Sequence, residues 1–520
     1  MSQLKKEISS FGLLMTSLSA MIGSGWLLSS MVAAKLAGPA AVLSWLIGGI
    51  MIAFIAVCFS ELSTAFPVAG GIARYGQFSH GKCISFIISW LAWLSCVAVA
   101  PTESIAILQY ASRFFDGLTY QVNDTFLLTN LGLTYAAVLV FIMAWINQKG
   151  IKMMIRYNNI LTIWKICVPL FVLTVLAYHQ FIPSNFTDQS FMPSGMNGVL
   201  SALSTTVIFS FLGFRECTSL AEEVKNPQRS IPIAAIGSVL YCTVFYVIMQ
   251  SVFIASMNPD AFSLGWGALS FDFDAGPFAG LALMLGLKWL ATIIYIDAII
   301  APMGAGLVYT ATTSRLLLAI SKNGFLPPAL QKLNKNQVPQ FALIVNGLVG
   351  LALLAPFEDW VALVRFQSVA IVVAYAIGPI ALLALRTTAP KLKRPFKLPY
   401  AYFFSTVTLY ICFLLIHWSS WENVLAIIIS CLAGLFIYFL HSGTEDMQHA
   451  KWFMIILTTC GITGYFGTFG GIEALNIWQE SLILLIGSIL AMYFGVKQRI
   501  NTDQYTKYIE DKETNYYDAI

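Results

Sequence analysis

Ser19-Ala-Met-Ile-Gly-Ser-Gly-Trp26 is the stretch that decides the fold, because it interrupts the first apolar segment of the chain. That segment runs from about Phe11 to Ala34, which is long enough to cross a bilayer as a helix. Its two central glycines weaken a helix by roughly 2 kcal/mol relative to alanine. In hydrocarbon, unpaired N–H and C=O groups are tolerated only where they line a cavity or meet a ligand. A break at Ile22–Gly25 would therefore offer amides to an anion such as a carboxylate, whereas close helix packing is the alternative role for these small residues.

The composition extends this membrane assignment to the whole chain. The 520 residues are 58% hydrophobic and 10% charged, with a mean hydropathy of +0.76, whereas soluble domains carry about 25% charged residues. The sequence therefore predicts an all-α polytopic membrane protein with about fourteen transmembrane helices. After the first segment, apolar runs of spanning length lie at about 40–60, 84–110, 131–147, 158–179, 198–221, 231–256, 281–312, 341–355, 360–385, 401–417, 423–440, 452–469 and 481–496.

The distribution of positive charge predicts the orientation. Placing the N-terminus in the cytoplasm puts roughly 23 Lys and Arg residues inside and about two, Lys35 and Arg113, outside. An even number of spans returns the chain to the same side, so residues 498–520 are predicted to form a cytoplasmic tail. We therefore expect a multi-pass protein of the cell membrane with both termini in the cytoplasm.

Several function classes find no support in the sequence. Nine scattered cysteines show neither a pairing pattern nor a metal-binding spacing. Nucleotide-binding loops, a hydrolase elbow and a nucleophile–base–metal constellation are not recognisable. We therefore expect a protein that is not an enzyme, with no cofactor, no metal and no nucleic-acid partner; the oligomeric state leaves no signal in the sequence.

The sixth span carries a second interruption. It reads Val207-Ile-Phe-Ser-Phe-Leu-Gly-Phe-Arg-Glu-Cys217, with Gly213 near its middle, about five spans after the first break. Interrupted helices at corresponding places in two five-helix halves indicate an inverted-repeat transporter with its site at the midplane. The alternative is two unrelated glycines in a chain that contains 37.

Ionisable residues inside spans are costly and indicate function. Burial favours the uncharged form of a lysine, so Lys165 is a candidate proton carrier that could release its proton near neutrality. The alternative is a lysine that reaches the cytoplasmic surface. Glu103 and Asp297 either titrate with transport or neutralise a nearby cation.

Arg215 follows the second interruption and cannot carry the proton, because a guanidinium stays charged. Its planar fork suits a carboxylate. Glu103, Asp297, the neighbouring Glu216 and the side chain of a substrate are all possible partners. A structural ion pair and a substrate contact both remain open at this point.

Four motifs resemble those of the amino acid–polyamine–organocation permeases, and together they cover about residues 10–390. They are the Ile22-Gly-Ser-Gly25 break, the Glu61…Pro67…Gly70-Gly71…Arg74-Tyr75 loop, the Phe211-Leu-Gly-Phe214…Glu223-Val-Lys-Asn-Pro227 run and Thr313-Ser-Arg315…Asn323-Gly-Phe-Leu-Pro327. The resemblance implies the five-plus-five inverted-repeat fold of the leucine transporter for residues 1–390, with helices 1 and 6 broken. Residues 391–497 then form the additional helices 11–14.

The resemblance also implies roles for individual residues. The substrate α-carboxylate would meet the amides of Gly23–Gly25, and the α-amino group would meet main-chain carbonyls around Ile22 and Phe209–Leu212. Phe209 or Phe214 would act as a gate. Lys165 matches the fifth-span lysine of proton-coupled members. The expected substrate-binding residues are Ile22, Gly23, Ser24, Gly25, Phe209, Leu212, Gly213, Phe214 and Arg215, and the expected proton-coupling residues are Lys165, Glu103 and Asp297.

One departure from the family pattern predicts the substrate class. The family usually has Gly-Phe-Glu or Gly-Val-Glu in the sixth span, whereas here Arg215 takes that place and the acid moves to Glu216. A cation beside the cavity suits an acidic amino acid and repels a basic one. Within the family, the chain resembles the aspartate/glutamate:proton symporters, and this resemblance implies proton-coupled symport of an acidic amino acid by alternating access. Alternatives are an exchanger of glutamate for a decarboxylation product, a neutral amino acid permease and a membrane amino acid sensor.

Overall fold

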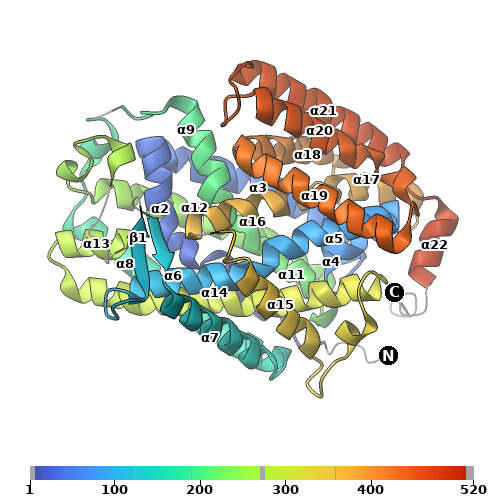
Figure 1. Cartoon of the computed structure of the whole chain (residues 1–520), viewed down its shortest axis with the longest axis horizontal. Helices are drawn as coiled ribbons and strands as arrows, with labels where there is room; N and C mark the ends of the chain where they lie inside the picture. Colours follow the sequence, from blue (N-terminus) through green and yellow to red (C-terminus); the bar gives the residue numbers. More distant parts are fainter. Residues whose placement is uncertain (1–5, 123–124, 189, 270–275, 358, 511–520) are drawn as a thin grey trace.

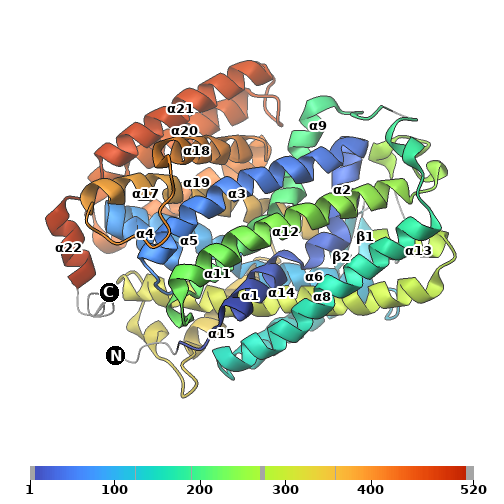
Figure 2. The ribbon, with the colours of Figure 1, turned by 180° about the vertical axis from the view of Figure 1, so that it is seen from behind.

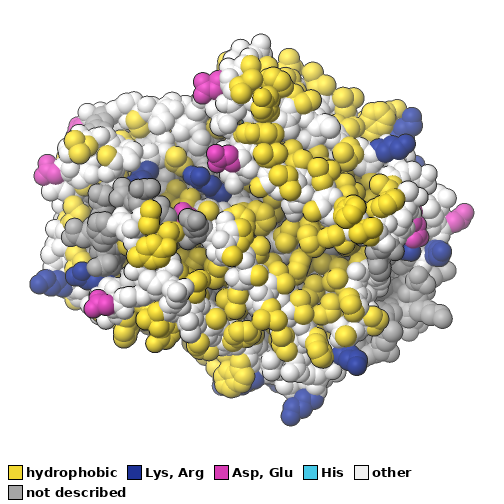
Figure 3. Space-filling view, viewed as in Figure 1, with side chains coloured by type: hydrophobic (Ala, Val, Ile, Leu, Met, Phe, Trp, Pro, Cys, Tyr) yellow, Lys and Arg dark blue, Asp and Glu magenta, His cyan; other side chains and the backbone are white. Residues whose placement is uncertain are grey.

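The computed structural model describes residues 6–122, 125–188, 190–269, 276–357 and 359–510. Ten helical stretches within these ranges are long and apolar enough to cross a membrane. Hydrophobic side chains cover the middle of the face seen in Figure 3, and charged side chains lie mostly toward its rims. Such a surface suits lipid rather than water, because lipid solvates apolar side chains without cost. The protein is thus an all-α, multi-pass membrane protein, as the sequence predicted.

Each of the fourteen predicted spans coincides with one helix or with consecutive helices. The first five spans, together with the short helix α4 that follows the second, are α1 (Ser10–Met21) with α2 (Ser24–Ala37), α3 (Ala41–Ala65), α4 (Gly71–His80), α5 (Lys82–Val97) with α6 (Val99–Ala111), α7 (Asn130–Asn147) and α8 (Ile151–His179). The next five, with the short α13, are α9 to α11 (Gly195–Ala202, Ile208–Phe211 and Glu216–Ser219), α12 (Pro227–Ala255), α13 (Pro277–Met284), α14 (Lys288–Lys322), α15 (Gln340–Ala352) and α16 (Trp360–Tyr375) with α17 (Ile377–Thr388).

The last helices pack together on one side of the molecule (Figure 1). They are α18 (Ala401–His417), α19 (Trp421–Ser442), α20 (Lys451–Phe466), α21 (Ile477–Lys497) and the short α22 (Thr502–Glu510). Part of the predicted cytoplasmic tail is therefore a helix, and residues 511–520 of that tail lie outside the described residues. A hairpin that the sequence did not predict, β1 (Thr119–Val122) and β2 (Thr125–Leu128), lies at the opposite end of the molecule from α4 and α22.

The break in the first span is confirmed. Helix α1 ends at Met21 and α2 begins at Ser24, so Ile22 and Gly23 alone are non-helical. The gap is narrower than the predicted Ile22–Gly25, because Ser24 and Gly25 already form the first turn of α2. Figure 2 shows α1 and α2 in succession beside α12.

The sixth span changes helix type instead of unwinding. A π-helical turn (Leu203–Val207) precedes α10, and a 3₁₀ turn (Leu212–Arg215) precedes α11. Such changes are typical of functional positions inside helices. A Cβ on Gly213 would lie 2.5 Å from the Met21 nitrogen and would overlap the backbone of Ala20. The two interrupted spans therefore cross in backbone contact, and only glycine fits at this crossing.

Two groups of contacts, each with a buried ion pair, join helices at the end of the molecule that holds α4 and α22. Near the N-terminus, the Lys225 amide donates to the Ile8 carbonyl at 3.0 Å, and Arg315 Nε donates to Glu223 Oε1 at 2.9 Å. Burial raises the pKa of Glu223, and the guanidinium of Arg315 opposes that rise. These contacts join the beginning of the chain, the segment after α11 and α14.

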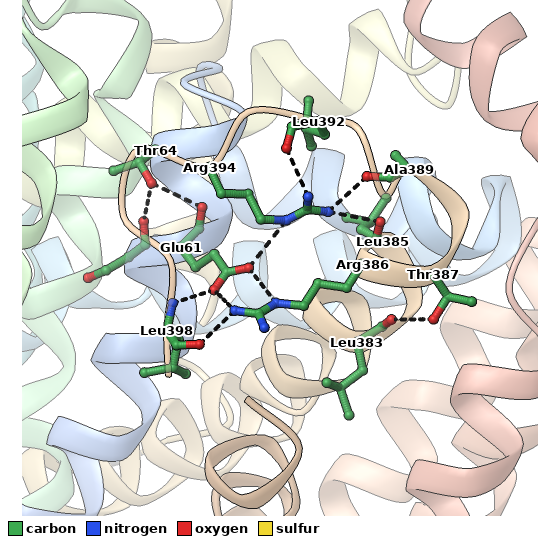
Figure 4. A network of polar contacts seen from close by, with 11 residues as sticks. Glu61, Thr64, Leu383, Leu385, Arg386, Thr387, Ala389, Leu392, Arg394 and Leu398 are labelled. Carbon is green, nitrogen blue, oxygen red and sulfur yellow. Dashed lines mark hydrogen bonds and ion pairs between the residues drawn. The ribbon is translucent and has the colours of Figure 1, made fainter. Parts of the chain in front are cut away.

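The second contact is the network drawn in Figure 4, which surrounds Glu61 of α3. Glu61 accepts hydrogen bonds from Arg386 Nε at 2.8 Å, Arg386 Nη2 at 2.5 Å and the Leu398 amide at 2.7 Å. Arg394 Nε lies 3.3 Å from the same carboxylate. Burial lowers the pKa of Arg394, and Glu61 opposes that change. The network ties α3 to α17 and to the segment before α18; sequence reasoning gave the Glu61 loop no such role.

Candidate functional site

A carboxylate occupies the amide end of α2. Glu103 lies on α6, and the Ser24 amide donates a hydrogen bond to its Oε2 atom at 2.8 Å. A Cβ on Gly23 would lie 2.6 Å from Glu103 Oε1, so the glycine leaves the room that this carboxylate fills. Free amides and the helix dipole both favour an anion at a helix N-terminus. The predicted anion-binding amide is therefore present, and a side chain of the protein itself is bound to it.

A lysine from another helix contacts α1, the first half of the broken span. Lys165 of α8 is fully buried, and its Nζ donates to the Ser19 carbonyl at 2.6 Å and lies 3.1 Å from Ser19 Oγ. Ser19 belongs to the last turn of α1, where the helix dipole favours a cation. Gly304 of α14 leaves room for this side chain, because a Cβ there would lie 3.0 Å from Nζ. Lys165 and Glu103 thus bind the two helix ends that meet at the break.

Asp297 of α14 lies close to the same break. Its two carboxylate oxygens accept hydrogen bonds from Trp26 Nε1 at 2.9 Å and from Trp164 Nε1 at 2.8 Å. Both donors are neutral indoles, and Trp164 directly precedes Lys165 in α8. Glu103, Lys165 and Asp297, predicted from three separate spans, are therefore brought together around α1 and α2.

Aromatic side chains enclose the break. Trp360, at the start of α16, donates from Nε1 to Ser24 Oγ at 2.9 Å and packs edge-on against Phe209, with ring centroids 5.7 Å apart. Tyr246 of α12 donates to the Met21 carbonyl at 2.6 Å. Sequence reasoning named Phe209 but missed Trp360 and Tyr246. The signal for Tyr246 was its hydroxyl in the middle of a span, which needs a polar partner.

Three other predicted residues make packing or structural contacts. Phe214 is fully buried and packs against Tyr375, at 5.5 Å, and Phe59, at 6.5 Å between ring centroids. The Leu212 carbonyl, expected near the substrate amino group, accepts a hydrogen bond from the Tyr375 hydroxyl at 3.3 Å. A Cβ on Gly25 would lie 2.5 Å from Ser210 Oγ, so Gly25 permits close contact between α2 and α10.

Arg215 pairs with its sequence neighbour. Its Nη2 lies 2.6 Å from Glu216 Oε1 and 2.6 Å from Cys96 Sγ of α5. The structural partners considered from sequence included Glu103 and Asp297, but both carboxylates are bound elsewhere, at Ser24 and at the two indoles. Arg215 and Glu216 are buried, yet Arg215 Nε, Arg215 Nη1 and Glu216 Oε2 have no hydrogen-bond partner among the described residues. Nε and Nη1 of the guanidinium therefore make no hydrogen bond among the described residues, although the Tyr375 hydroxyl also acts on this group.

The arrangement has the chemistry of a binding site rather than of a reaction centre. It offers a helix-end amide, a lysine, two carboxylates and aromatic walls, all around a discontinuous helix. Within the described ranges, no three His, Cys, Asp or Glu side chains gather closely enough to hold a metal ion. The main-chain gap at the membrane midplane is the place where transporters bind small polar substrates.

Comparison with known proteins agrees with this geometry. The family model for amino acid permeases matches residues 8–459, which include both interrupted spans. The chain belongs to the amino acid permease family. The match extends into α20 and leaves α21 outside.

Curated relatives of this permease share its length and carry transport names. It is 35% identical to the glutamate/serine transporter AimA of Bacillus subtilis (strain 168), over 99% of this chain and 97% of the relative. It is 34% identical to the aspartate-proton symporter of the same organism, over 95% and 96% of the two chains. The branched-chain amino acid permease BcaP is 30% identical over 86% of this chain and 94% of the relative. The family and these relatives are transporters, not enzymes.

Proposed function

We propose that this permease takes up an acidic amino acid, aspartate or glutamate, together with a proton by alternating access. The observation that carries the proposal is the hydrogen bond from the Ser24 amide to a carboxylate, at 2.8 Å. An amino acid presents the same group, so the same amide suits its α-carboxylate. The names of two relatives, a glutamate/serine transporter and an aspartate-proton symporter, agree with this substrate class.

Arg215 supplies selection for a second carboxylate. It lies in the 3₁₀ turn that follows α10, and the crossing at Gly213 holds this turn against the last residues of α1. Its unused Nε and Nη1 donors are buried, and a buried donor without a partner costs about 1–3 kcal/mol. The side-chain carboxylate of aspartate or glutamate would satisfy these donors.

The proton is carried among Glu103, Lys165 and Asp297. These three buried groups face one another across the broken span, so a change of charge on one alters the charge balance of the others. Residues 1–390 form the transport unit in this proposal, and residues 391–497 add four further helices. In this proposal both termini lie in the cytoplasm, and the substrate enters from the outside of the cell.

Transport by purified protein in liposomes tests the proposal. Radiolabelled aspartate or glutamate should accumulate when the liposome interior is alkaline, and unlabelled acidic amino acids should compete better than neutral or basic ones. Lys165→Ala should lose accumulation driven by the pH gradient. Accumulation of acidic amino acids that ignores the pH gradient, or that appears only with a counter-substrate inside, would reject proton symport in favour of exchange.

One observation favours a second candidate, a neutral amino acid such as serine. Glu216 Oε1 lies 2.6 Å from Arg215 and neutralises its charge, so the pair as a whole carries no net charge toward the cavity. The same competition panel separates the two candidates. Stronger competition by serine than by aspartate and glutamate would select the neutral substrate.

A further inference from the structure

The substrate-carboxylate position of this permease is already filled by a carboxylate of the chain. Glu103 accepts the Ser24 amide at 2.8 Å, and it is 2% exposed. Its other oxygen lies where a side chain on Gly23 would stand. A second carboxylate cannot take the same N–H at hydrogen-bond distance while Glu103 remains there, because two oxygens would compete for one donor and two like charges would face each other.

We propose that Glu103 is an internal competitor for the α-carboxylate of the substrate, and that its displacement is the step at which a proton is taken up. The inference rests on the proposed function only in requiring that the ligand be an amino acid. It gives proton coupling a structural cause: substrate and Glu103 share one anion site, so the displaced group must lose its charge.

The charges around Glu103 support this exchange. Lys165 of α8 acts on Glu103 electrostatically, and Asp297 of α14 acts on the same lysine. The Tyr246 hydroxyl of α12 donates to the Met21 carbonyl and also interacts electrostatically with Glu103. Two further packed elements present neutral side chains: Met143 of α7 lies beside Gly306 and Glu103, and Gln367 of α16 donates to Thr102. With Lys165 protonated and both carboxylates ionised, the three groups already carry a net charge of −1, so a second anion at the Ser24 amide would be uncompensated.

The proton balance follows from this count. When the amino acid arrives, its α-carboxylate accepts the Ser24 N–H, and Glu103 binds one proton from water on the open side. When the amino acid leaves on the other side, Glu103 releases the proton there and returns to the Ser24 amide. Each turnover moves one amino acid and one proton, so a substrate with a net charge of −1 crosses without net charge movement.

Binding to purified protein tests the inference directly. Above the pH at which Glu103 loses its proton, the affinity of the wild-type protein for L-glutamate should fall about tenfold per pH unit, because binding is linked to one proton. In weakly buffered solution, a pH-sensitive dye should report uptake of about one proton per bound glutamate. This second measurement uses the wild type alone, so it does not depend on whether any variant folds.

Glu103→Gln supplies the decisive variant. A neutral glutamine cannot occupy the site as an anion. The affinity of the variant for the amino acid should therefore rise at high pH and no longer depend on pH, and binding should take up no proton. Exchange of internal for external substrate should persist, whereas pH-driven accumulation should be lost. The matched control is Glu480→Gln, because Glu480 is also a buried glutamate that accepts a backbone amide, from Thr468 at 2.6 Å, but lies far along the chain in α21.

Three outcomes would overturn the inference: binding without proton uptake, a pH dependence that survives in Glu103→Gln, or one that disappears in Asp297→Asn but not in Glu103→Gln. The first two measurements are repeated with L-serine. If neither aspartate nor glutamate binds but serine binds with the same proton uptake, the acidic substrate is rejected and the competitor role of Glu103 stands.

Discussion

Two buried clusters of charged side chains in this permease differ in how many of their polar atoms have a hydrogen-bond or ion-pair partner. Around Glu61, both carboxylate oxygens meet guanidinium groups of Arg386 and Arg394, and Oε2 also accepts a backbone amide (Figure 4). In the Arg215–Glu216 pair, one contact joins the partners, and three buried polar atoms stay without partners among the described residues.

The difference separates a structural role from a binding role. A buried ion cluster holds helices together only when its remaining hydrogen-bonding capacity is also satisfied. The Glu61 cluster meets that condition and joins α3 to α17. The Arg215–Glu216 pair does not meet it, and it lies directly after the change of helix type in the sixth span. Incomplete pairing at that place keeps donors for a ligand that arrives from outside the chain.

The largest expected effect comes from breaking the complete cluster. Glu61→Gln leaves two guanidinium groups without their anion, which costs about 3–5 kcal/mol of stability in a buried setting. Arg386 is 24% exposed, so water recovers part of this cost and the lower end of that range is expected. Thermal unfolding in detergent measures the loss, and transport of every substrate should decline alike.

An exposed ion pair is the control for that experiment. Lys82 and Glu445 are bridged at 2.9 Å, with side chains 35% and 51% exposed. Glu445→Gln should change stability by less than about 1 kcal/mol. If Glu61→Gln lowers stability no more than Glu445→Gln does, the Glu61 cluster contributes no more to stability than an exposed ion pair, and the structural role assigned to it is wrong.

Arg215→Gln tests the incomplete pair. Losing the cation should weaken aspartate and glutamate binding by about 2 kcal/mol or more, roughly 30-fold, and should affect serine far less. Competition assays on the purified variant give the ratio. Glu216→Gln removes the neutralising partner and should shift the same ratio toward acidic substrates. A uniform loss for all amino acids in Arg215→Gln would place the pair in the same structural class as the Glu61 cluster.

A substitution that adds a methyl group but no charge distinguishes steric fit from electrostatics in the same region. Gly25→Ala introduces a Cβ 2.5 Å from Ser210 Oγ, which forces α2 and α10 apart unless that hydroxyl moves. We expect about a tenfold loss of affinity for acidic and neutral substrates alike, or about 1.4 kcal/mol. Gly237→Ala is the control, because its Cβ would meet Leu14 at an ordinary 3.8 Å. Selective loss of acidic substrates in Gly25→Ala would contradict a role in fit.

The smallest effect concerns His80, a buried group of α4 that lies outside the spans. Burial lowers its pKa to about 4, against an ordinary value of 6.5. Between these values the unfolded chain binds a proton that the folded protein does not bind, so stability falls as the pH falls below about 6.5, by about 1.4 kcal/mol per pH unit. Thermal unfolding at pH 7 and pH 6 should show a loss of about 0.7 kcal/mol, and His80→Gln should flatten it. Parallel pH curves for both proteins would show that His80 contributes nothing to it.

The sequence predicted what depends on local pattern. Hydropathy located the spans, and the glycines at Gly23 and Gly213 located both interruptions. It did not predict which distant residues meet: Glu103 binds the amide of Ser24, 79 positions away, and Glu61 meets Arg386, 325 positions away. Such pairings depend on the depth and rotation of neighbouring helices, which hydropathy does not specify. The neighbour Glu216 was among the partners weighed for Arg215, but Cys96 was not, because a thiol carries no charge pattern to detect.

The contact at Gly213 has a mechanical consequence. The backbone of the sixth span contacts the backbone at the end of α1 there, with no side chain between them. Packed interiors transmit strain instead of absorbing it, so a tilt of α1 is passed to the 3₁₀ turn at Leu212–Arg215 without slack. We therefore expect the crossing to act as a common pivot, so that a movement of either interrupted helix also moves the other.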